Sequence, residues 1–226
     1  MIIPEEGSLL LVNKPKSWTS FDVVNKLRYL LKIKKIGHAG TLDPLAKGLL
    51  LIGVGKYTKK LESLQGLDKT YEGIIEIGKT TPSFDLETPF DSFSDYAHVT
   101  PKAIAAAVEA LTGELDQMPP IYSAIKLNGQ RAYKSARKNE IIELKSRKIQ
   151  VYKFEITQVH LPEIHFRVVC SKGTYIRSLA KDLGEQLGVG GYLKELVRTH
   201  VGNYKLENAL QIEQLIDQIN LENESN

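Results

Sequence analysis

The 226-residue sequence has little of what an exported protein needs. It holds one cysteine, Cys170, and so cannot form an intramolecular disulfide bond. A chain of this length buries roughly 70% of its unfolded surface without such bridges, so their absence is typical of a reducing compartment. Glu5 and Glu6 also stand where a secretory signal would carry positive charge. We therefore expect a cytoplasmic protein.

Long apolar runs are missing as well. An apolar run such as residues 49–52 falls far short of the roughly 18 residues that a membrane span requires, so we expect no membrane contact. No internal repeat, low-complexity tract or Gly-, Ser- or Pro-rich linker divides the chain, which predicts a single domain over residues 1–226. Charged residues at 25% and hydrophobic residues at 42% are average for globular proteins and exclude disordered, collagenous and fibrous classes.

Charge is distributed in blocks along the chain. Residues 1–66 carry 11 Lys and Arg against 5 Asp and Glu, and residues 119–205 carry 16 against 7, whereas the segments 67–118 and 206–226 are acidic. If the fold brings the two basic blocks together, they form a positive face of the kind that binds phosphate backbones. The alternative is that these cations only solvate the surface.

Hydrophobic patterns predict strands and helices in irregular alternation. Apolar runs predict strands at residues 7–13, 48–54, 70–77, 148–159 and 163–170. Helical spacing predicts a helix capped by Ser20 and further helices at residues 101–111 with a Thr100 cap, 175–187 and 207–220. Residues 79–99, rich in Thr, Ser, Pro and Asp, are typical of a connecting region. This order favours a mixed α+β fold over a doubly wound parallel sheet.

One loop carries a chemically informative set of residues. Two glycines enclose His38, and Asp43 precedes Pro44. Glycine permits backbone conformations that a side chain forbids, and proline pushes the residue before it into an extended geometry. An Asp-Pro pair is most often only a turn former. Here the loop runs directly into the buried strand predicted at residues 48–54, which would anchor the carboxylate rigidly.

The run GHAGTLDPLAKGLLLIGVGKYTK at residues 37–59 resembles the catalytic motif of the TruB-type tRNA pseudouridine synthases. Further motifs of this family match in the same order: Lys14-Pro15 with Trp18-Thr19-Ser20, Lys69-Thr70-Tyr71, residues 119–126 with 129–133, residues 170–179, and residues 196–199 with Val201-Gly202. The resemblance covers residues 8 to about 205. By these ordered motifs the chain is identified as a bacterial member of the family.

The resemblance implies a fold, a reaction and a partner. The fold is an α+β pseudouridine synthase domain with a mainly antiparallel sheet flanked by helices. It would hold an RNA-gripping insertion at about residues 119–148 and an acidic C-terminal helix at about residues 207–220, without the PUA-type barrel that many members add. The reaction would turn uridine 55 in the T loop of tRNA into pseudouridine without a cofactor or a metal. The expected partner is the T arm of tRNA, bound by a monomer.

By the same resemblance, three residues carry the chemistry. Asp43 is the nucleophile that attacks C6 of the base or C1′ of the ribose and later leaves. Arg177 is the counter-ion that keeps this carboxylate charged in a pocket without water. Tyr71 stacks on the uracil and assists removal of the proton at C5. Judged without the resemblance, Arg177 would be a surface arginine early in a helix and Tyr71 a tyrosine of the core.

The resemblance also implies a set of substrate-binding residues. They are His38, Tyr71, Tyr175, Leu196, Lys14, Lys126 and Arg131. His38 would fill the space that the flipped base leaves, and Tyr175 and Leu196 would line the uracil pocket. Without the resemblance, these last two are packing residues.

Lys126 and Arg131 belong to a basic segment interleaved with tyrosines, which suits RNA with unstacked bases. The alternative is a solvated helix face. We expect this segment to be weakly ordered without RNA between about residues 127 and 145. A metal is not expected, because the five histidines show no paired ligand spacing and Cys170 stands alone.

Two other functions would suit a carboxylate on such a loop. The first is an RNA chaperone with a dead site, against which the joint presence of Asp43, Tyr71 and Arg177 argues. The second is a glycoside hydrolase with Asp43 as its nucleophile. It would need a second carboxyl group as the acid, and residues 37–48 contain no other.

Overall fold

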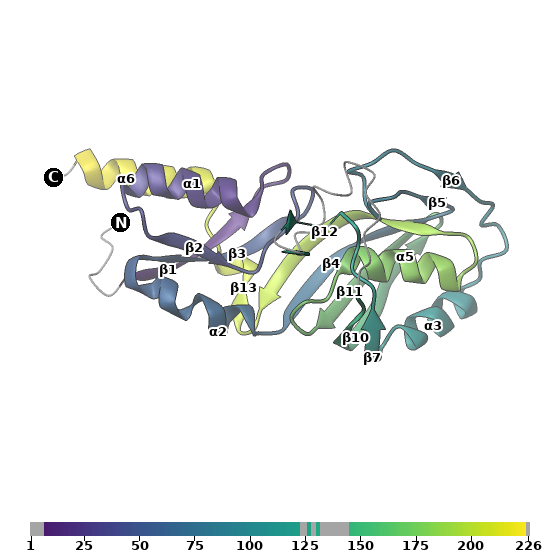
Figure 1. The fold of residues 1–226 in the computed structure, drawn as a ribbon. Helices are drawn as coiled ribbons and strands as arrows, with labels where there is room; N and C mark the ends of the chain where they lie inside the picture. Colours follow the sequence, from purple (N-terminus) through teal and green to yellow (C-terminus); the bar gives the residue numbers. More distant parts are fainter. Residues whose placement is uncertain (1–6, 123–125, 128–129, 132–144, 225–226) are drawn as a thin grey trace. The chain divides into compact units, whose positions relative to one another are not determined.

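The computed structural model describes residues 7–122, 126–127, 130–131 and 145–224 (Figure 1). They form a mixed α+β fold with a mainly antiparallel sheet flanked by helices, which confirms the predicted class. Within these residues no helix combines the length and the apolar character needed to cross a bilayer.

The chain forms two compact units. Met1–Glu72 and Leu196–Asn226 make up the first unit, and Gly73–Glu195 makes up the second unit. Strands β4 (Lys69–Ile77) and β12 (Gly191–Val201) each run from one unit into the other. A single domain over the whole chain stays a prediction, and each unit is described by itself below.

The first unit is built around strand β3 (Lys47–Val54). Its other elements are β1 (Ser8–Lys14), β2 (Ile36–Ala39), β13 (Tyr204–Lys205), the helices α1 (Ser20–Leu31), α2 (Leu61–Gln65) and α6 (Ile212–Glu224), and the 3-10 helices η1 (Gly55–Lys60) and η2 (Leu206–Asn208).

Strand β3 has neighbours on both edges. β1 pairs with it antiparallel along its length, from Ser8 opposite Val54 to Lys14 opposite Gly48. On the other edge, β2 pairs antiparallel with its C-terminal half, and β12 pairs parallel with Lys47 and Gly48 at its start. The two strands therefore share this edge of β3: β2 pairs with its end, and β12 pairs with its start.

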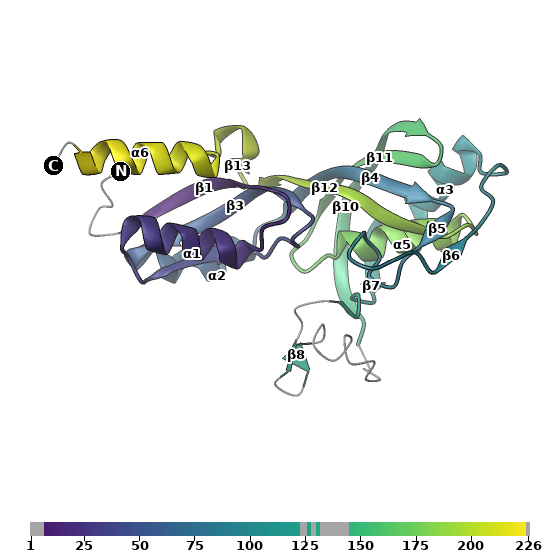
Figure 2. The ribbon, with the colours of Figure 1, turned by 90° about the horizontal axis from the view of Figure 1, so that it is seen from above.

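Helices cover both faces of β3. Helices α1 and α6 lie over one face, and α2 with η1 lies over the other (Figure 1; Figure 2). Leu50 and Ile52 belong to the core beneath α1 and α6, and Leu49 and Leu51 belong to the opposite core. Successive side chains of a strand point to opposite faces, so a strand buried on both faces needs an unbroken apolar run. This is why residues 49–52 show no alternation.

Helix α1 begins with a capping box, and the prediction that Ser20 is its cap is wrong. Thr19 is the N-cap: its side chain accepts from the Asp22 backbone N–H (3.0 Å), and the Asp22 carboxylate accepts from the Thr19 N–H (2.8 Å). The Ser20 hydroxyl instead accepts from the backbone N–H of Leu42 at 2.9 Å and donates to the Leu42 carbonyl at 3.2 Å. Ser20 thereby fastens the loop that carries Asp43 to the start of α1.

The second unit contains β10 (Arg147–His160) and β11 (Glu163–Cys170) as its longest hairpin. Its other elements are β5 (Lys79–Thr80), β6 (Ser92–Phe93), β7 (Gly113–Gln117), β8 (Lys126–Leu127), β9 (Gln130–Arg131), and the helices α3 (Pro101–Ala110) and α5 (Ile176–Gln186).

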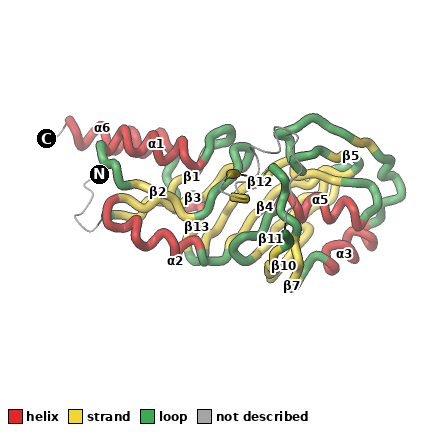
Figure 3. The backbone as a smooth tube through the Cα atoms, in the orientation of Figure 1, coloured by secondary structure: helices red, strands yellow, loops and turns green. Residues whose placement is uncertain are grey.

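The main sheet of the second unit runs in the order β12, β4, β11, β10, β7 (Figure 3). Helix α3 packs against α5 and against β10. The rings of Phe154 and Phe166, on paired strands, meet edge to face with centroids 5.9 Å apart. As predicted, Thr100 caps α3 by accepting from the Ala103 backbone N–H.

Helix α5 approaches the start of β12 at glycines. A Cβ atom on Gly184 would lie 2.2 Å from the carbonyl carbon of Gly190 and from the amide nitrogen of Gly191. No side chain fits there, so the helix lies directly on the strand backbone. This contact fixes the helix that carries Arg177.

Other differences from the predictions concern the C-terminal helix and several strands. The C-terminal helix begins at Ile212 rather than near Glu207, because residues 206–208 form the 3-10 helix η2 and the Gln214 side chain accepts from the Gln211 N–H before the first turn. Strands β2, β7 and β12 were not predicted. Strand β2 holds the motif residue His38, so the stretch predicted as loop is in part a strand.

Candidate active site

Asp43 lies in the loop between β2 and β3, at residues 40–46. Its side chain is half-buried, and its backbone carbonyl accepts from the Ala46 N–H in a tight turn. The Pro44 carbonyl accepts from the Ser17 N–H at 2.8 Å, which joins this loop to the turn after β1. The predicted nucleophile therefore stands on a loop that two other segments of the first unit hold in place.

Lys14, at the end of β1, is fully buried. Its ammonium donates to the carbonyls of Trp18 (2.6 Å), Pro15 (3.0 Å) and Pro44 (3.3 Å). Burial lowers the pKa of Lys14 to about 8, although the neighbouring charge of Asp43 acts in the opposite sense. In this structure Lys14 ties the first motif to the Asp43 loop, and its contact with RNA stays a prediction.

Arg198 holds the same loop from the other side. Its side chain is 1% exposed, and its guanidinium donates to the carbonyls of Leu49 (Nε, 2.8 Å) and Gly40 (Nη2, 3.0 Å). Gly48, with φ of +109°, lies opposite Arg198, and a Cβ there would come within 2.5 Å of the Arg198 carbonyl oxygen. Arg198 thus spans both ends of the loop. Its motif had been noticed in the sequence, but its anchoring role had not.

His38 is in β2, next to the Asp43 loop. Burial and the positive charge of Arg198 lower the pKa of His38, so the imidazole is neutral at neutral pH. Its Nδ1 atom is buried and has no hydrogen-bond partner among the residues that the structure describes. A neutral ring of this kind can stack and hydrogen-bond without carrying a charge into a base stack.

Tyr71 and Leu196 are also in the first unit. Tyr71, in β4, is 8% exposed, and Leu196, in β12, is 9% exposed. Lys69, two residues before Tyr71, is buried and donates to the carbonyls of Gln65 and Leu67. This lysine fixes the turn from which β4 starts and so helps to position Tyr71.

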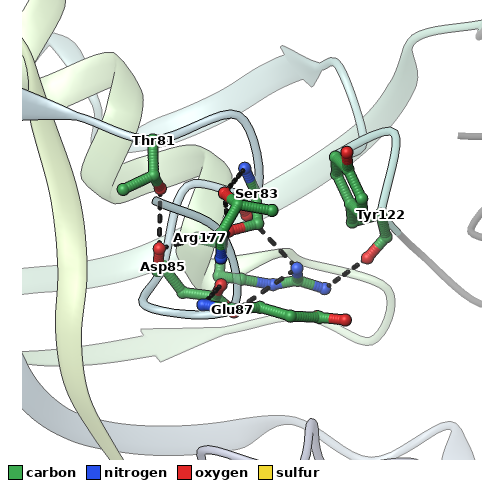
Figure 4. Close-up of polar contacts among 7 residues, drawn as sticks. Thr81, Ser83, Asp85, Glu87, Tyr122 and Arg177 are labelled. Carbon is green, nitrogen blue, oxygen red and sulfur yellow. Dashed lines mark hydrogen bonds and ion pairs between the residues drawn. The ribbon is translucent and has the colours of Figure 1, made fainter. Parts of the chain in front are cut away.

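Arg177 is in the second unit, in the first turn of α5, and is 3% exposed. Its guanidinium pairs with the Asp85 carboxylate (3.5 Å) and donates to the carbonyls of Ser83 (3.2 Å) and Tyr122 (3.0 Å), as Figure 4 shows. Charge-assisted contacts of this kind are stronger than neutral ones. They fix the orientation of the arginine that was predicted as the counter-ion.

Asp85 is a buried partner of Arg177 that the sequence alone did not single out. It is 5% exposed, and its carboxylate also accepts from the Glu87 N–H (2.9 Å). The hydroxyl groups of Thr81 (2.6 Å) and Ser83 (3.1 Å) donate to the Asp85 carbonyl. The available signal was two hydroxyl residues and a carboxylate within five positions, a composition that favours local side-chain-to-backbone bonds. The sequence predicted a connecting region at these residues.

Tyr175 is the N-cap residue of α5. The side chain of Gln117 accepts from its backbone N–H (2.7 Å) and donates to its carbonyl (3.0 Å). The guanidinium of Arg147 lies 5.1 Å from the centre of its ring. The backbone of Tyr175 is thus fixed at both its N–H and its carbonyl group. Its contact with uracil stays a prediction.

The predicted RNA-gripping segment is described only in part. Lys126 and Arg131 lie opposite each other across the short pair β8 and β9. Residues 123–125, 128–129 and 132–144 lie outside the described residues, and with them most of the segment predicted to be weakly ordered.

The structure thus brings His38, Asp43, Lys14, Tyr71 and Leu196 into the first unit. Arg177, Tyr175, Lys126 and Arg131 belong to the second unit. Asp43 and Arg177 belong to different units, and their pairing stays a prediction.

Comparison with known families gives two matches that follow each other along the chain. The model described as TruB family pseudouridylate synthase (N terminal domain) matches residues 28–176. The model described as tRNA pseudouridylate synthase B C-terminal domain matches residues 177–226.

Relatives from several bacteria are similar over nearly their whole length. The protein named tRNA pseudouridine synthase B of Flavobacterium johnsoniae is 54% identical over 214 residues, which cover 92% of this chain and 93% of the relative. Proteins of the same name from Phocaeicola vulgatus and Chlorobaculum tepidum are 48% and 46% identical, with 92% and 96% of this chain covered and 92% and 93% of those relatives.

Solved structures share the fold. A chain of the Cbf5-Nop10-Gar1 complex matches with a TM-score of 0.74 at 29% identity, covering 94% of this chain and 54% of that chain. The H/ACA RNP bound to a substrate RNA containing 2′-deoxyuridine matches with a TM-score of 0.73 at 26% identity, covering 98% of this chain and 56% of that chain. The present chain therefore spans about half the length of these structural relatives.

The family models define the class of enzyme, which is that of the pseudouridylate synthases, isomerases that rearrange uridine within RNA. Within this class the chain belongs to the TruB family. This confirms the family and the fold that the sequence motifs predicted.

Proposed function

We propose that this chain converts uridine 55 in the T loop of tRNA into pseudouridine, with Asp43 as the nucleophile. Relatives at 46–54% identity carry the name tRNA pseudouridine synthase B, which supports tRNA as the substrate. The observation that carries the proposal is a half-buried carboxylate, Asp43, on a loop held by two buried cations, Lys14 and Arg198.

The reaction is an isomerisation, so no atom is gained or lost overall. The bond from N1 of uracil to C1′ of the ribose breaks, the base turns, and a bond forms between C5 and C1′. The proton on C5 then leaves, and N1 ends with a proton. A carboxylate suits this sequence because it can attack C6 of the base or C1′ of the ribose and later depart. The reaction has no redox step.

Arg177 is proposed to pair with Asp43 and keep it ionised. A carboxylate in a site without water would otherwise gain a proton, because burial disfavours its charged form. Asp85 and the Ser83 carbonyl hold the guanidinium, which leaves its charge fixed in place before the substrate arrives. Tyr71 is proposed to stack on the uracil and to assist removal of the C5 proton.

The substrate base must leave its stack before Asp43 can reach it. We propose that His38 fills the vacated space, and its lowered pKa supports this role because a neutral imidazole stacks without bringing in a charge. Tyr175 and Leu196 would line the uracil pocket. Lys14, Lys126 and Arg131 were assigned to RNA binding, and the last two are proposed to grip the T arm. The enzyme is expected to act in the cytoplasm, as a monomer.

The test is release of tritium from tRNA labelled at C5 of uridine. We expect the wild-type protein to release it and Asp43→Asn, a near-isosteric change, to abolish release. Asp68→Asn is the matched control, because Asp68 is an exposed carboxylate of the same unit outside the site. Release by Asp43→Asn at the control's rate would overturn the role of Asp43.

A second measurement separates the enzyme from an RNA chaperone. If the wild type and Asp43→Asn refold tRNA equally and neither releases tritium, the protein is a chaperone. The target position is tested with tRNA in which uridine 55 alone is replaced by cytidine. We expect this tRNA to release no tritium, and unchanged release would contradict the proposed position.

A further inference from the structure

A basic hollow in the first unit takes no part in the reaction described above. It lies at the C-terminal end of α1, has a volume of about 420 Å³, and is lined by Arg28, Lys32, Ile33 and Lys34. Three of its four lining residues are cations. Within the described part of the chain, none of these three pairs with a carboxylate. The ligand chemistry that such a hollow suits is a phosphate group.

Arg28 is held in a fixed position. Its guanidinium donates to the carbonyl of Ile36 (Nη2, 2.8 Å) and to the Asn25 side chain (Nη1, 3.3 Å), and it lies 5.4 Å from the centre of the Phe21 ring. A guanidinium fixed in this way loses little freedom when it binds an anion.

Lys32 stands where the backbone favours glycine. It is the C-cap residue of α1 in the left-handed conformation, with φ of 55°. Lysines after a helix also complement the helix dipole, which is the ordinary explanation for Lys32 and Lys34. The dipole places only roughly half a negative charge at this end, however, and three cations exceed it. A net positive charge remains for an anion.

The hollow is linked directly to the site. The Ile36 carbonyl that holds Arg28 belongs to the first residue of β2, and His38 is two residues further along the same strand. At about 3.3 Å per residue, the two positions are roughly 7 Å apart along β2. An RNA strand bound at His38, as proposed above, would therefore come close to the hollow.

Exposed aromatic rings favour RNA over a small free anion as the occupant. Phe21 is 55% exposed and Tyr29 is 79% exposed, and both are on α1, the helix that ends at the hollow. Aromatic rings beside cations suit RNA, because bases stack on the rings while the cations hold the backbone.

We propose that Arg28, Lys32 and Lys34 form a phosphate-binding site that holds one backbone phosphate of the tRNA substrate. The inference rests on the proposed function, since it extends the RNA-binding surface of the same enzyme. It places an RNA contact on α1, outside the segment at residues 119–148 to which RNA gripping was assigned.

The test is the double variant Lys32→Gly/Lys34→Gln. Both side chains are exposed, and glycine suits the left-handed backbone at position 32, so we expect the midpoint of thermal unfolding not to fall. The dissociation constant for unmodified tRNA should rise about 10-fold. A plot of the logarithm of the dissociation constant against the logarithm of the salt concentration should also become less steep. We expect its slope to fall by about 0.7–0.9, which corresponds to the loss of one phosphate contact.

The matched control is Lys60→Gln/Lys205→Gln, which removes the same charge from two exposed lysines of the same unit that lie outside the motif at residues 37–59. We expect it to retain wild-type activity and to bind tRNA within twofold of the wild type. An equal loss of affinity in both double variants would overturn the proposal, because it would reflect net charge alone. Wild-type affinity and salt slope in Lys32→Gly/Lys34→Gln would overturn it as well.

Inorganic phosphate distinguishes the two sources of the anion. We expect it to compete weakly with tRNA for the wild type and to compete less for Lys32→Gly/Lys34→Gln. Tight binding of inorganic phosphate together with unchanged tRNA affinity in the variant would assign the hollow to a small anion and overturn the RNA assignment. These measurements are of binding, so absence of pseudouridine formation would refute the proposed function without deciding the role of the hollow.

Discussion

The two units of the molecule use buried cations in different ways. In the first unit, Lys14 and Arg198 are buried, and they donate hydrogen bonds to backbone carbonyls of the Asp43 loop and of its neighbours. In the second unit, Arg177 is itself the group assigned to the chemistry, and a buried carboxylate, Asp85, holds it. One unit uses cations to shape a loop, and the other uses an anion to orient a cation. Substitutions of the same kind should therefore have different effects in the two units.

The largest effect is expected for Arg177→Lys. A lysine keeps the charge but replaces a planar donor set that reaches Asp85, Ser83 and Tyr122 with one ammonium. Turnover on tRNA should fall at least about 100-fold, the loss typical of a misplaced electrostatic group, while the circular dichroism spectrum stays that of the wild type. Arg167→Lys, at an exposed position of the same unit, is the control. Wild-type turnover by Arg177→Lys would refute the role of this arginine.

Asp85→Asn should come next, and its main effect should be on stability. Removing one partner of a buried ion pair leaves the other charge without compensation, so the free energy of unfolding should fall by about 3 kcal/mol. Urea unfolding measures this loss, with the exposed Asp95→Asn as control. An unchanged midpoint would mean that the Ser83 and Tyr122 carbonyls suffice to hold Arg177.

In the first unit, Arg198→Lys should cost less. A lysine can keep one of the two bonds to Gly40 and Leu49, so we expect a loss of about 2 kcal/mol in the free energy of unfolding. Turnover should fall less than in Arg177→Lys. Lys205→Gln, a cation on the neighbouring strand, is the control. The contrary outcome is that Arg198→Lys loses as much turnover as Arg177→Lys while remaining more stable to unfolding than we expect. That result would contradict the distinction between a cation that anchors a loop and a cation that acts in the reaction.

The smallest effect concerns pH and Lys14. Its pKa is about 8 in the folded protein, against 10.5 for an ordinary lysine. Between these values the unfolded chain binds a proton that the folded chain does not, so the free energy of unfolding rises with pH. Relative to Lys14→Gln, the wild type should gain up to about 1 kcal/mol between pH 8 and pH 9. Lys16→Gln, at an exposed position, should follow the wild-type curve, and parallel curves for wild type and Lys14→Gln would contradict the assignment.

The sequence predicted those parts of the fold whose signal is local. The apolar run at residues 49–52 predicted β3, and Thr100 before Pro101 predicted the start of α3. Strand β2 was missed because four residues containing a glycine carry no pattern of their own, and it is a strand because β3 pairs with it. Pairing with a neighbouring strand, rather than local propensity, therefore makes these residues a strand.

The site followed the same division. Asp43 and Arg177 could be proposed as site residues because the motifs around them are continuous in the sequence, and their roles stay predictions. Asp85 and the anchoring role of Arg198 were missed because they depend on contacts across 92 and 158 positions of the chain, between Asp85 and Arg177 and between Gly40 and Arg198. No local pattern encodes such a contact, and only the folded chain reveals it.

Strand β12 has a consequence for how this enzyme can change during evolution. Its first residue lies beneath α5 at Gly184, and its later residues include Leu196 and Arg198. Inserting or deleting one residue between these points would turn every following side chain to the opposite face. Arg198 would then point away from Gly40, and the Asp43 loop would lose its guanidinium anchor. We therefore expect natural variants to differ in this strand by substitution rather than by insertion or deletion.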